Sequence, residues 1–217
     1  MKINKKQISL LIKRIFDILV SGIVLIVLLP IFVIIGIFIE IDSRGPVFFV
    51  HERVGKDGKI FKAYKLRTMI QGADKKTEGI FINRDNLYIT RMGKFLRRSG
   101  IDELPQLINV FKGDMSLVGP RPTLKYQVEN YNDIQKQRLL IKPGITGWAL
   151  INGRNKLTWP ERIKLDIWYI ENRSSWLDLK ILFKTIIVVV NGEDMYADRE
   201  RDNVMIINKN EKNTCIK

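Results

Sequence analysis

The sequence predicts an α+β protein that is mainly helical, with an N-terminal membrane helix, a small β-hairpin and a helical domain. Three observations predict this architecture: an uncharged apolar run near the N-terminus, two β-rich runs joined by an Asp-Gly turn, and later segments with amphipathic helical spacing. We divide the 217 residues into a basic segment with the membrane helix (1–42), one globular domain (43–200) and a polar tail (201–217).

The predicted membrane helix contains no charged residue from Ile18 to Ile39. As a helix this run is long enough to cross the roughly 30 Å of hydrocarbon in a bilayer. It is longer than the apolar region of a signal peptide, and Phe38 to Glu40 offer no small-residue cleavage site. We therefore expect a retained membrane helix.

The residues leave open whether this helix spans the membrane. Lysines and arginines flank it on both sides, which by the positive-inside rule favours both ends in the cytoplasm. Pro30 removes a backbone hydrogen bond near the middle, so we expect a kink or break, and a bent helix can enter and leave by one face. A spanning helix that tolerates its proline is the alternative. Arg14 and Asp17 have the spacing of an interfacial ion pair.

The globular domain begins with the predicted hairpin. Val47–Val54 and Ile60–Leu66 are rich in β-branched and aromatic residues, and Gly55–Gly58 between them contains Asp-Gly, a strong hairpin signal. Polar residues with glycine predict a loop over Gln71–Asn86. A short basic helix is expected around Met92–Arg98.

Two further helices have recognisable ends. Glu103–Phe111 carries an apolar stripe, and we predict Asp102 as its N-cap and Gly113 as its stop. Thr158–Glu161 has capping-box spacing and predicts the start of a helix that ends near Glu171.

The last predicted helix, Trp176–Val190, is apolar over most of its circumference. Lys180 and Lys184 form a narrow polar stripe on it. At about 15 residues it is too short to span a bilayer. It lies either in the membrane interface or inside the domain, and its residues favour neither alternative.

Composition limits the chemistry. The formal net charge of +14 indicates anionic partners such as phospholipid headgroups, phosphorylated substrates or nucleic acid. The single cysteine, Cys215, and the single histidine, His51, exclude disulfide frameworks, cysteine metal sites and Ser-His-Asp triads. Any chemistry must then come from carboxylates, cations or a bound metal ion.

Asp102 and Glu103 are adjacent acids that follow Arg97 and Arg98 and precede Pro120–Pro122. A carboxylate with an ordinary pKa of about 3.9 is ionised at neutral pH and can attack phosphorus without a base. Arginines and magnesium can offset its repulsion from a phosphate, and Glu103 is a suitable oxygen ligand for that metal. The alternative is that these are only a helix cap, a first-turn acid and solvated arginines.

An ordered set of motifs adds to this argument. In chain order they are Arg97, Asp102-Glu103-Leu104-Pro105-Gln106-Leu107, Gly113-Asp114-Met115-Ser116-Leu117-Val118-Gly119-Pro120-Arg121-Pro122, Lys142-Pro143-Gly144-Ile145-Thr146-Gly147-Trp148 and Asn152-Gly153-Arg154. This set resembles the bacterial sugar transferases, the monotopic polyprenyl-phosphate phosphoglycosyltransferases, from about Lys13 to Gly192. The chain is most similar to short members such as the undecaprenyl phosphate diacetylbacillosamine 1-phosphate transferases.

The resemblance implies a re-entrant membrane helix and a cytoplasmic catalytic domain with interfacial amphipathic helices, at the inner membrane of a bacterium. It also implies ping-pong transfer of a sugar 1-phosphate from a UDP-sugar to undecaprenyl phosphate, in which Asp102 attacks the β-phosphorus, releases UMP and holds the phosphosugar covalently. By the same likeness Mg²⁺ is assigned to Glu103, and substrate phosphate to Arg67, Arg97, Arg121 and Arg154.

One departure and two alternatives accompany the resemblance. Members of the family often have Ser-Pro at the helix break, where this chain has Leu29-Pro30, so the break geometry is open. The chain could instead be a non-catalytic membrane module that binds anionic lipid or nucleic acid, or a structural partner of other glycan-assembly enzymes with a dead site. Because the cations surround a carboxylate pair, we expect no nucleic acid as partner.

Overall fold

The computed structural model describes residues 5–73 and 87–190, and its elements form a mainly helical α+β fold. The longer elements are α1 (Lys5–Asp42), β1 (Phe48–Val54), β2 (Ile60–Leu66), α3 (Arg91–Ser99), α4 (Leu107–Lys112), α8 (Trp159–Asn172) and α9 (Ser175–Val190). The shorter ones are β3 (Ser116–Val118), α5 (Lys125–Glu129), α6 (Asp133–Lys136), β4 (Gly144–Thr146), α7 (Trp148–Ile151) and four 3₁₀ turns, Lys56–Gly58, Ile101–Gln106, Gln137–Leu140 and Arg154–Lys156. Most of the predicted loop Gln71–Asn86 and the tail 201–217 lie outside the described residues.

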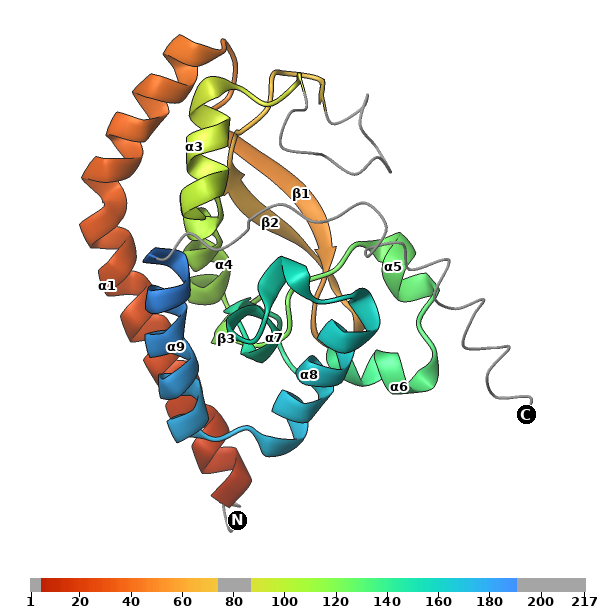
Figure 1. Cartoon of the computed structure of the whole chain (residues 1–217). Coiled ribbons are helices and arrows are strands. Elements are labelled where there is room, and N and C mark those ends of the chain that lie inside the picture. Colours follow the sequence, from red (N-terminus) through yellow and green to blue (C-terminus); the bar gives the residue numbers. More distant parts are fainter. Residues whose placement is uncertain (1–4, 74–86, 191–217) are drawn as a thin grey trace.

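Helix α1 is continuous over 38 residues and contains Pro30. Of the predicted kink or break, the break is wrong, because the helix continues through Pro30, and it is bowed along its length (Figure 1). Within residues 5–73 and 87–190 it is the one helix long and apolar enough to cross a membrane. Its outer face remains uncovered, with Ile26 and Ile41 about three-quarters exposed.

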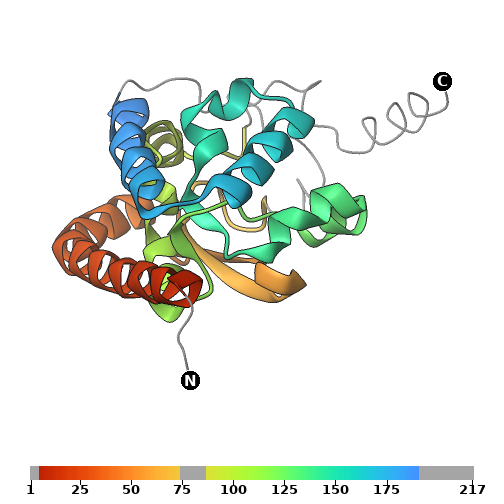
Figure 2. The same ribbon diagram turned by 90° about the horizontal axis from the view of Figure 1, so that it is seen from below.

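The rest of the protein lies on one side of α1, with α9 and α3 beside it and α5 and α6 farthest from it (Figures 1 and 2). Contacts occur near both ends of the helix. Lys13 Nζ lies 2.7 Å from Asp178 Oδ2 in α9, and Asp42 Oδ2 accepts a hydrogen bond of 2.7 Å from the Met92 backbone N–H at the start of α3. One domain therefore contacts the helix along nearly its whole length.

Arg14 and Asp17 connect α1 to the domain rather than to each other, so the predicted ion pair between them is wrong. The Arg14 guanidinium donates to the carbonyl oxygens of Val110 and Phe111, at 2.6 and 2.8 Å, at the end of α4. Asp17 Oδ1 accepts from the Leu117 backbone N–H at 3.1 Å. Arg14 thus binds carbonyl oxygens at a helix end that have no partner within the helix. For both charged side chains these hydrogen bonds to backbone groups are more stabilising than an exposed ion pair would be.

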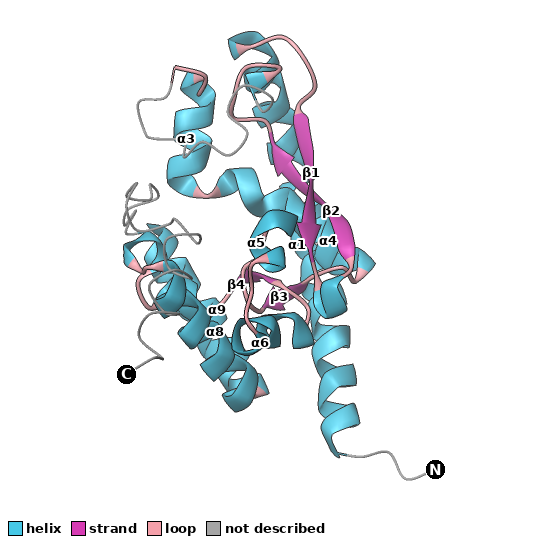
Figure 3. Ribbon diagram, turned by 90° about the vertical axis from the view of Figure 1, so that its right-hand side faces the viewer, coloured by secondary structure: helices cyan, strands magenta, loops and turns pink. Residues whose placement is uncertain are grey.

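The predicted hairpin is confirmed. β1 and β2 pair antiparallel from Phe48 opposite Leu66 to Val54 opposite Ile60, and Figure 3 shows the two strands crossing side by side. Asp57 and Gly58 have φ of 56° and 75°, which is the left-handed conformation that an Asp-Gly sequence adopts at low cost. Side chains then alternate between the two faces of the hairpin.

The predicted short basic helix is confirmed as α3, but the segment after it differs from the prediction. Gly100, with φ of 72°, ends α3 and leads directly into the 3₁₀ turn Ile101–Gln106. Asp102 lies inside that turn and is not a helix N-cap. The Glu103 backbone N–H donates to the Gly100 carbonyl oxygen at 3.3 Å, the three-residue spacing that defines a 3₁₀ turn. The predicted stop at Gly113, with φ of 99°, is confirmed.

Helices α8 and α9 complete the core. The capping box is confirmed, because Glu161 Oε2 accepts from the Thr158 backbone N–H and hydroxyl at 2.8 and 2.7 Å. On α9, Ile181 is fully buried in the main apolar cluster, while Trp176 is 77% and Phe183 67% exposed. One face of α9 therefore packs inside the domain, and the other face is apolar and exposed.

Candidate active site

The hairpin and the 3₁₀ turn Ile101–Gln106 together place the two predicted acids. The turn packs against β2, and Lys65 of that strand points its ammonium at Glu103, with Nζ 2.5 Å from Oε1. Asp102 is 7% exposed. Within the described part of the chain its carboxylate makes no hydrogen bond or ion pair. The two neighbouring acids therefore have different environments.

Glu103 is held by a second cation. Arg121 binds it through both guanidinium nitrogens, with Nη1 2.9 Å from Oε2 and Nη2 2.6 Å from Oε1. This fork geometry fixes the orientation of both groups. Glu103 thus accepts three charge-assisted hydrogen bonds, and Arg121 is brought to the edge of the acid pair.

The loop that carries Arg121 is fixed by two close backbone approaches. β3 and β4 pair in parallel, and Gly119 N donates to Thr146 O at 2.9 Å. A Cβ on Gly144 would lie 2.1 Å from Gly119 N, so this approach requires glycine. The sequence motifs Gly113–Pro122 and Lys142–Trp148 therefore serve to position Arg121.

A buried ion pair supports the same loop from behind. Arg138 and Asp166 are each 2% exposed, and Arg138 Nη2 lies 2.6 Å from Asp166 Oδ2. The same guanidinium donates to Tyr131 Oη at 2.5 Å and to the Arg121 carbonyl oxygen at 3.3 Å. The position of the Arg121 backbone therefore depends on this network.

The electrostatics separate the two acids. Burial raises the pKa of Asp102, and the neighbouring Glu103 raises it further, against the opposing effect of Lys65, Arg97 and Arg121. Burial also acts to raise the pKa of Glu103, but Arg121 and Lys65 outweigh it and hold that pKa well below its usual range. Opposite pKa shifts in two neighbouring acids are typical of acids that have different roles. Glu103 is a fixed anion, and Asp102 is a buried carboxylate among cations.

Arg97 and Arg154 also lie around the acids. Arg97, in the last turn of α3, donates through Nε to Thr68 Oγ1 at 2.9 Å and acts electrostatically on Asp102. Arg154 has φ of 49°, and its pKa is lowered by burial and by Arg121 while both acids oppose that shift. Together with Arg121, two more of the predicted phosphate-binding arginines thus surround the pair.

Arg67 lies elsewhere. Its side chain is buried, and its Nη2 donates to the carbonyl oxygens of Ser43 and Ile39 at the end of α1. Glu40 Oε2 lies 3.9 Å from the same nitrogen. The structure therefore does not bring Arg67 to the acid pair, and in this arrangement it stabilises the C-terminus of α1.

Three residues of the site are absent from the sequence prediction. Lys65, His51 and Arg53 lie on one face of the hairpin, the face toward the acids. Burial, then Arg53 and Lys65, lower the pKa of His51 to about 3, so the imidazole is neutral. Neither of its buried ring nitrogens has a hydrogen-bond partner among residues 5–73 and 87–190. Strand alternation within the predicted hairpin was the signal that could have grouped these three residues.

Few side chains near the acid pair could bind a metal ion. Within the described residues, no group of three or more His, Cys, Asp or Glu side chains could hold a metal ion. Magnesium, however, is commonly bound through one or two carboxylates together with substrate phosphates. Asp102 and Glu103 fit that arrangement and do not fit a metal site formed by protein alone.

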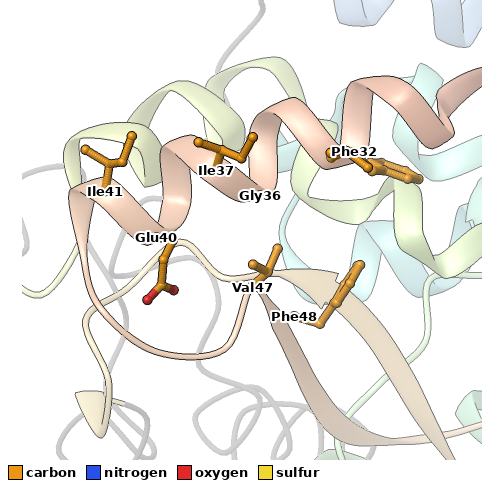
Figure 4. Close-up of a pocket in the computed structure, with 8 residues that line it drawn as sticks. Phe32, Gly36, Ile37, Glu40, Ile41, Val47 and Phe48 are labelled. Atoms are coloured by element: carbon orange, nitrogen blue, oxygen red, sulfur yellow. The ribbon is translucent and has the colours of Figure 1, made fainter.

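A separate apolar slot opens on the membrane helix, away from these charges. It has a volume of about 470 Å³ and lies between the C-terminal half of α1 and the start of β1, lined by Phe32, Val33, Gly36, Ile37, Glu40, Ile41, Val47 and Phe48 (Figure 4). A Cβ built on Gly36 would lie 3.4 Å from Cγ1 of Val47, so the helix and the start of the hairpin are in contact there. The slot is continuous with the exposed apolar face of α1.

An exposed apolar helix together with an acid pair surrounded by cations is typical of one class of protein, the membrane-associated enzymes that act on phosphorylated substrates. The particular family follows from comparison with known proteins. Residues 8–192 match the family described as bacterial sugar transferase, and the chain belongs to that family. It is therefore a transferase.

Several relatives support this assignment. The chain is 43% identical to the uncharacterized sugar transferase EpsL of Bacillus subtilis, over 85% of this chain and 90% of that protein. It is 38% identical to the undecaprenyl-phosphate galactose phosphotransferase of Salmonella typhimurium, over 88% of this chain and 43% of the relative. It is 40% identical to the UDP-N-acetylgalactosamine-undecaprenyl-phosphate N-acetylgalactosaminephosphotransferase of Aeromonas hydrophila, over 83% and 44%. The chain spans less than half the length of the last two.

Proposed function

We propose that this protein transfers a sugar 1-phosphate from a UDP-sugar to undecaprenyl phosphate through a covalent intermediate on Asp102. The names of the Salmonella and Aeromonas relatives supply the substrate class. The observation that carries the proposal is the contrast between the two acids: Glu103 is fully paired, whereas Asp102 is buried among cations without a hydrogen bond inside the described chain. A carboxylate in that state is available to a phosphorus atom.

In the first step an Asp102 carboxylate oxygen forms a bond to the β-phosphorus of the UDP-sugar. The bond from that phosphorus to the bridging oxygen breaks, and UMP leaves with the electron pair. In the second step an oxygen of undecaprenyl phosphate attacks the same phosphorus and releases the Asp102 carboxylate. Arg97, Arg121 and Arg154 lower the repulsion between anionic nucleophile and anionic substrate in both steps.

Glu103 would hold Mg²⁺ together with the substrate phosphates. The bound ion would neutralise charge on the phosphate oxygens and the leaving nucleotide. Because both Glu103 oxygens are engaged by Lys65 and Arg121, those cations must yield part of their contact when metal and donor bind. We therefore expect metal and donor to bind together.

We further propose that α1 enters and leaves one leaflet, on the cytoplasmic face of the bacterial inner membrane. The domain contacts at Lys13 and Asp42 are about 40 Å apart along an α-helix. A perpendicular spanning helix would draw this polar domain into the hydrocarbon, which is costly. The exposed apolar face of α9, with Trp176 and Phe183, supports an orientation along the interface.

The test is the intact mass of the purified protein in detergent with Mg²⁺ and a panel of UDP-sugars. We expect UMP release and one added phosphosugar with the correct donor, and neither in Asp102→Ala. An adduct that persists in Asp102→Ala would place the nucleophile elsewhere. Binding of nucleic acid or anionic lipid without turnover of any donor would favour the non-catalytic alternative.

A further inference from the structure

Arg53 lies on the face of the hairpin that forms the floor of the site. It stands opposite Phe61 in the strand register and shares its face with His51, two residues earlier. The next residue, Val54, donates its backbone N–H to the Thr123 carbonyl oxygen at 2.9 Å. This bond joins the end of β1 to the chain that carries Arg121, so Arg53 and Arg121 are neighbours.

The Arg53 guanidinium is half-buried and, within the described residues, has no hydrogen bond or ion pair. The neighbouring Arg121 is committed to Glu103. Burial and then Arg121 lower the pKa of Arg53 to about 10, with Glu103 opposing. Arg154 experiences the same repulsion from Arg121. The region between these three arginines therefore has an excess of positive charge, which favours the binding of an anion there.

This region lies one step away from the nucleophile. On the shared face of the hairpin, Lys65, whose ammonium binds Glu103, stands opposite Phe49, and Arg53 lies four residues farther along β1. The cations that act on Asp102 are Lys65, Arg97 and Arg121, whereas Arg53 acts on Arg121 and Glu103. An anion at Arg53 would thus be next to the group attacked by Asp102 rather than at the attacked group itself. In a diphosphate donor, the phosphate adjacent to the attacked one is the α-phosphate.

We propose that Arg53 binds the α-phosphate of the donor, the phosphate that leaves as a nucleoside monophosphate. The inference rests on the proposed function and adds a binding residue to it. Cleavage of the bond between the β-phosphorus and the bridging oxygen gives the α-phosphate a second negative charge. A guanidinium already in place stabilises that charge more in the transition state than in the bound donor, which accelerates the first step.

Calorimetric titration of the full chain in detergent with UMP and with uridine tests this subsite. We expect Arg53→Gln to weaken UMP binding about ten- to a hundredfold, the effect of losing one charge-assisted hydrogen-bonding group, and to leave uridine binding unchanged. Arg53→Lys should fall between the two, because it keeps the charge and loses the fork. Lys62→Gln, which removes the same charge from the exposed opposite face of the hairpin, should match the parent.

The acceptor provides the second arm. With a preformed phosphosugar adduct, we expect the KM for undecaprenyl phosphate to be unchanged in Arg53→Gln. A raised acceptor KM with parental UMP binding would assign Arg53 to the other phosphate and overturn the proposal, as would equal losses of UMP and uridine. If Arg53→Gln fails to fold, Arg53→Lys decides, and parental UMP binding in that variant contradicts the subsite. A parent protein that forms no adduct refutes the proposed function instead.

Discussion

Removal of the Asp166 carboxylate should destabilise the protein strongly, because it leaves the Arg138 guanidinium buried without its counter-charge. Both side chains are 2% exposed, and their closest atoms are 2.6 Å apart. Breaking a buried pair by removing one partner costs about 3 to 5 kcal/mol. The rings of Trp159 and Tyr131 stay against the guanidinium, with centroids at 5.1 and 5.9 Å, and retain part of the stabilisation.

For Asp166→Ala we therefore expect the lower end, a loss of about 3 kcal/mol. For a chain of this size that corresponds to a fall in Tm of roughly 6 to 12 °C, measured by thermal unfolding in detergent at one scan rate. Glu129→Ala is the matched control, since its pair with Lys125 spans 3.9 Å and both side chains are more than 60% exposed. Its Tm should change by less than about 2 °C. Equal shifts in the two variants would refute the role of burial.

Three more results are expected. The rate of adduct formation should fall as the pH drops through the raised pKa of Asp102, with an acid limb above about 3.9. Lys65→Met removes a cation that lowers this pKa, so it should move the acid limb to higher pH. A limb that stays in place would contradict the electrostatic coupling between Lys65 and Asp102. Glu103→Gln should lose activity mainly through a weaker magnesium titration, and an unchanged titration would exclude Glu103 as ligand. Gly93→Ala should reduce stability and adduct formation together, because the added Cβ would lie 2.0 Å from Thr68 O. The hydroxyl of the same threonine accepts the hydrogen bond that holds the Arg97 side chain. Unaltered thermal unfolding would contradict this prediction and show that α3 shifts to make room for the methyl group.

Local features of the fold could be predicted from the sequence where one residue type determines the conformation. Asp57-Gly58 indicated the hairpin, and Thr158 with Glu161 indicated the start of α8. The N-cap at Asp102 was wrong because the chain turns at Gly100 and the 3₁₀ turn that follows already includes Asp102, and such competition between local signals is settled by packing. The parallel pair β3–β4 was missed, since each strand has only three residues.

The acid pair and three of its arginines were identified from motifs, but their geometry was not. Arg67 was expected in the site and instead binds the end of α1, while Arg53 was not expected there and lies beside Arg121. Both are arginines of the hairpin region, and which one faces the acids depends on how the turn Ile101–Gln106 docks on β2. That docking is a long-range contact which no local pattern encodes.

The central claim is that Asp102 itself bonds to phosphorus, and the rate of glycolipid formation by Asp102→Asn tests it most directly. The substitution keeps the shape of the side chain and removes its nucleophilic charge. With saturating UDP-sugar, undecaprenyl phosphate and Mg²⁺, we expect a loss of at least about a thousandfold, equivalent to 4 kcal/mol of barrier. Glycolipid formation at the parental rate would contradict the mechanism.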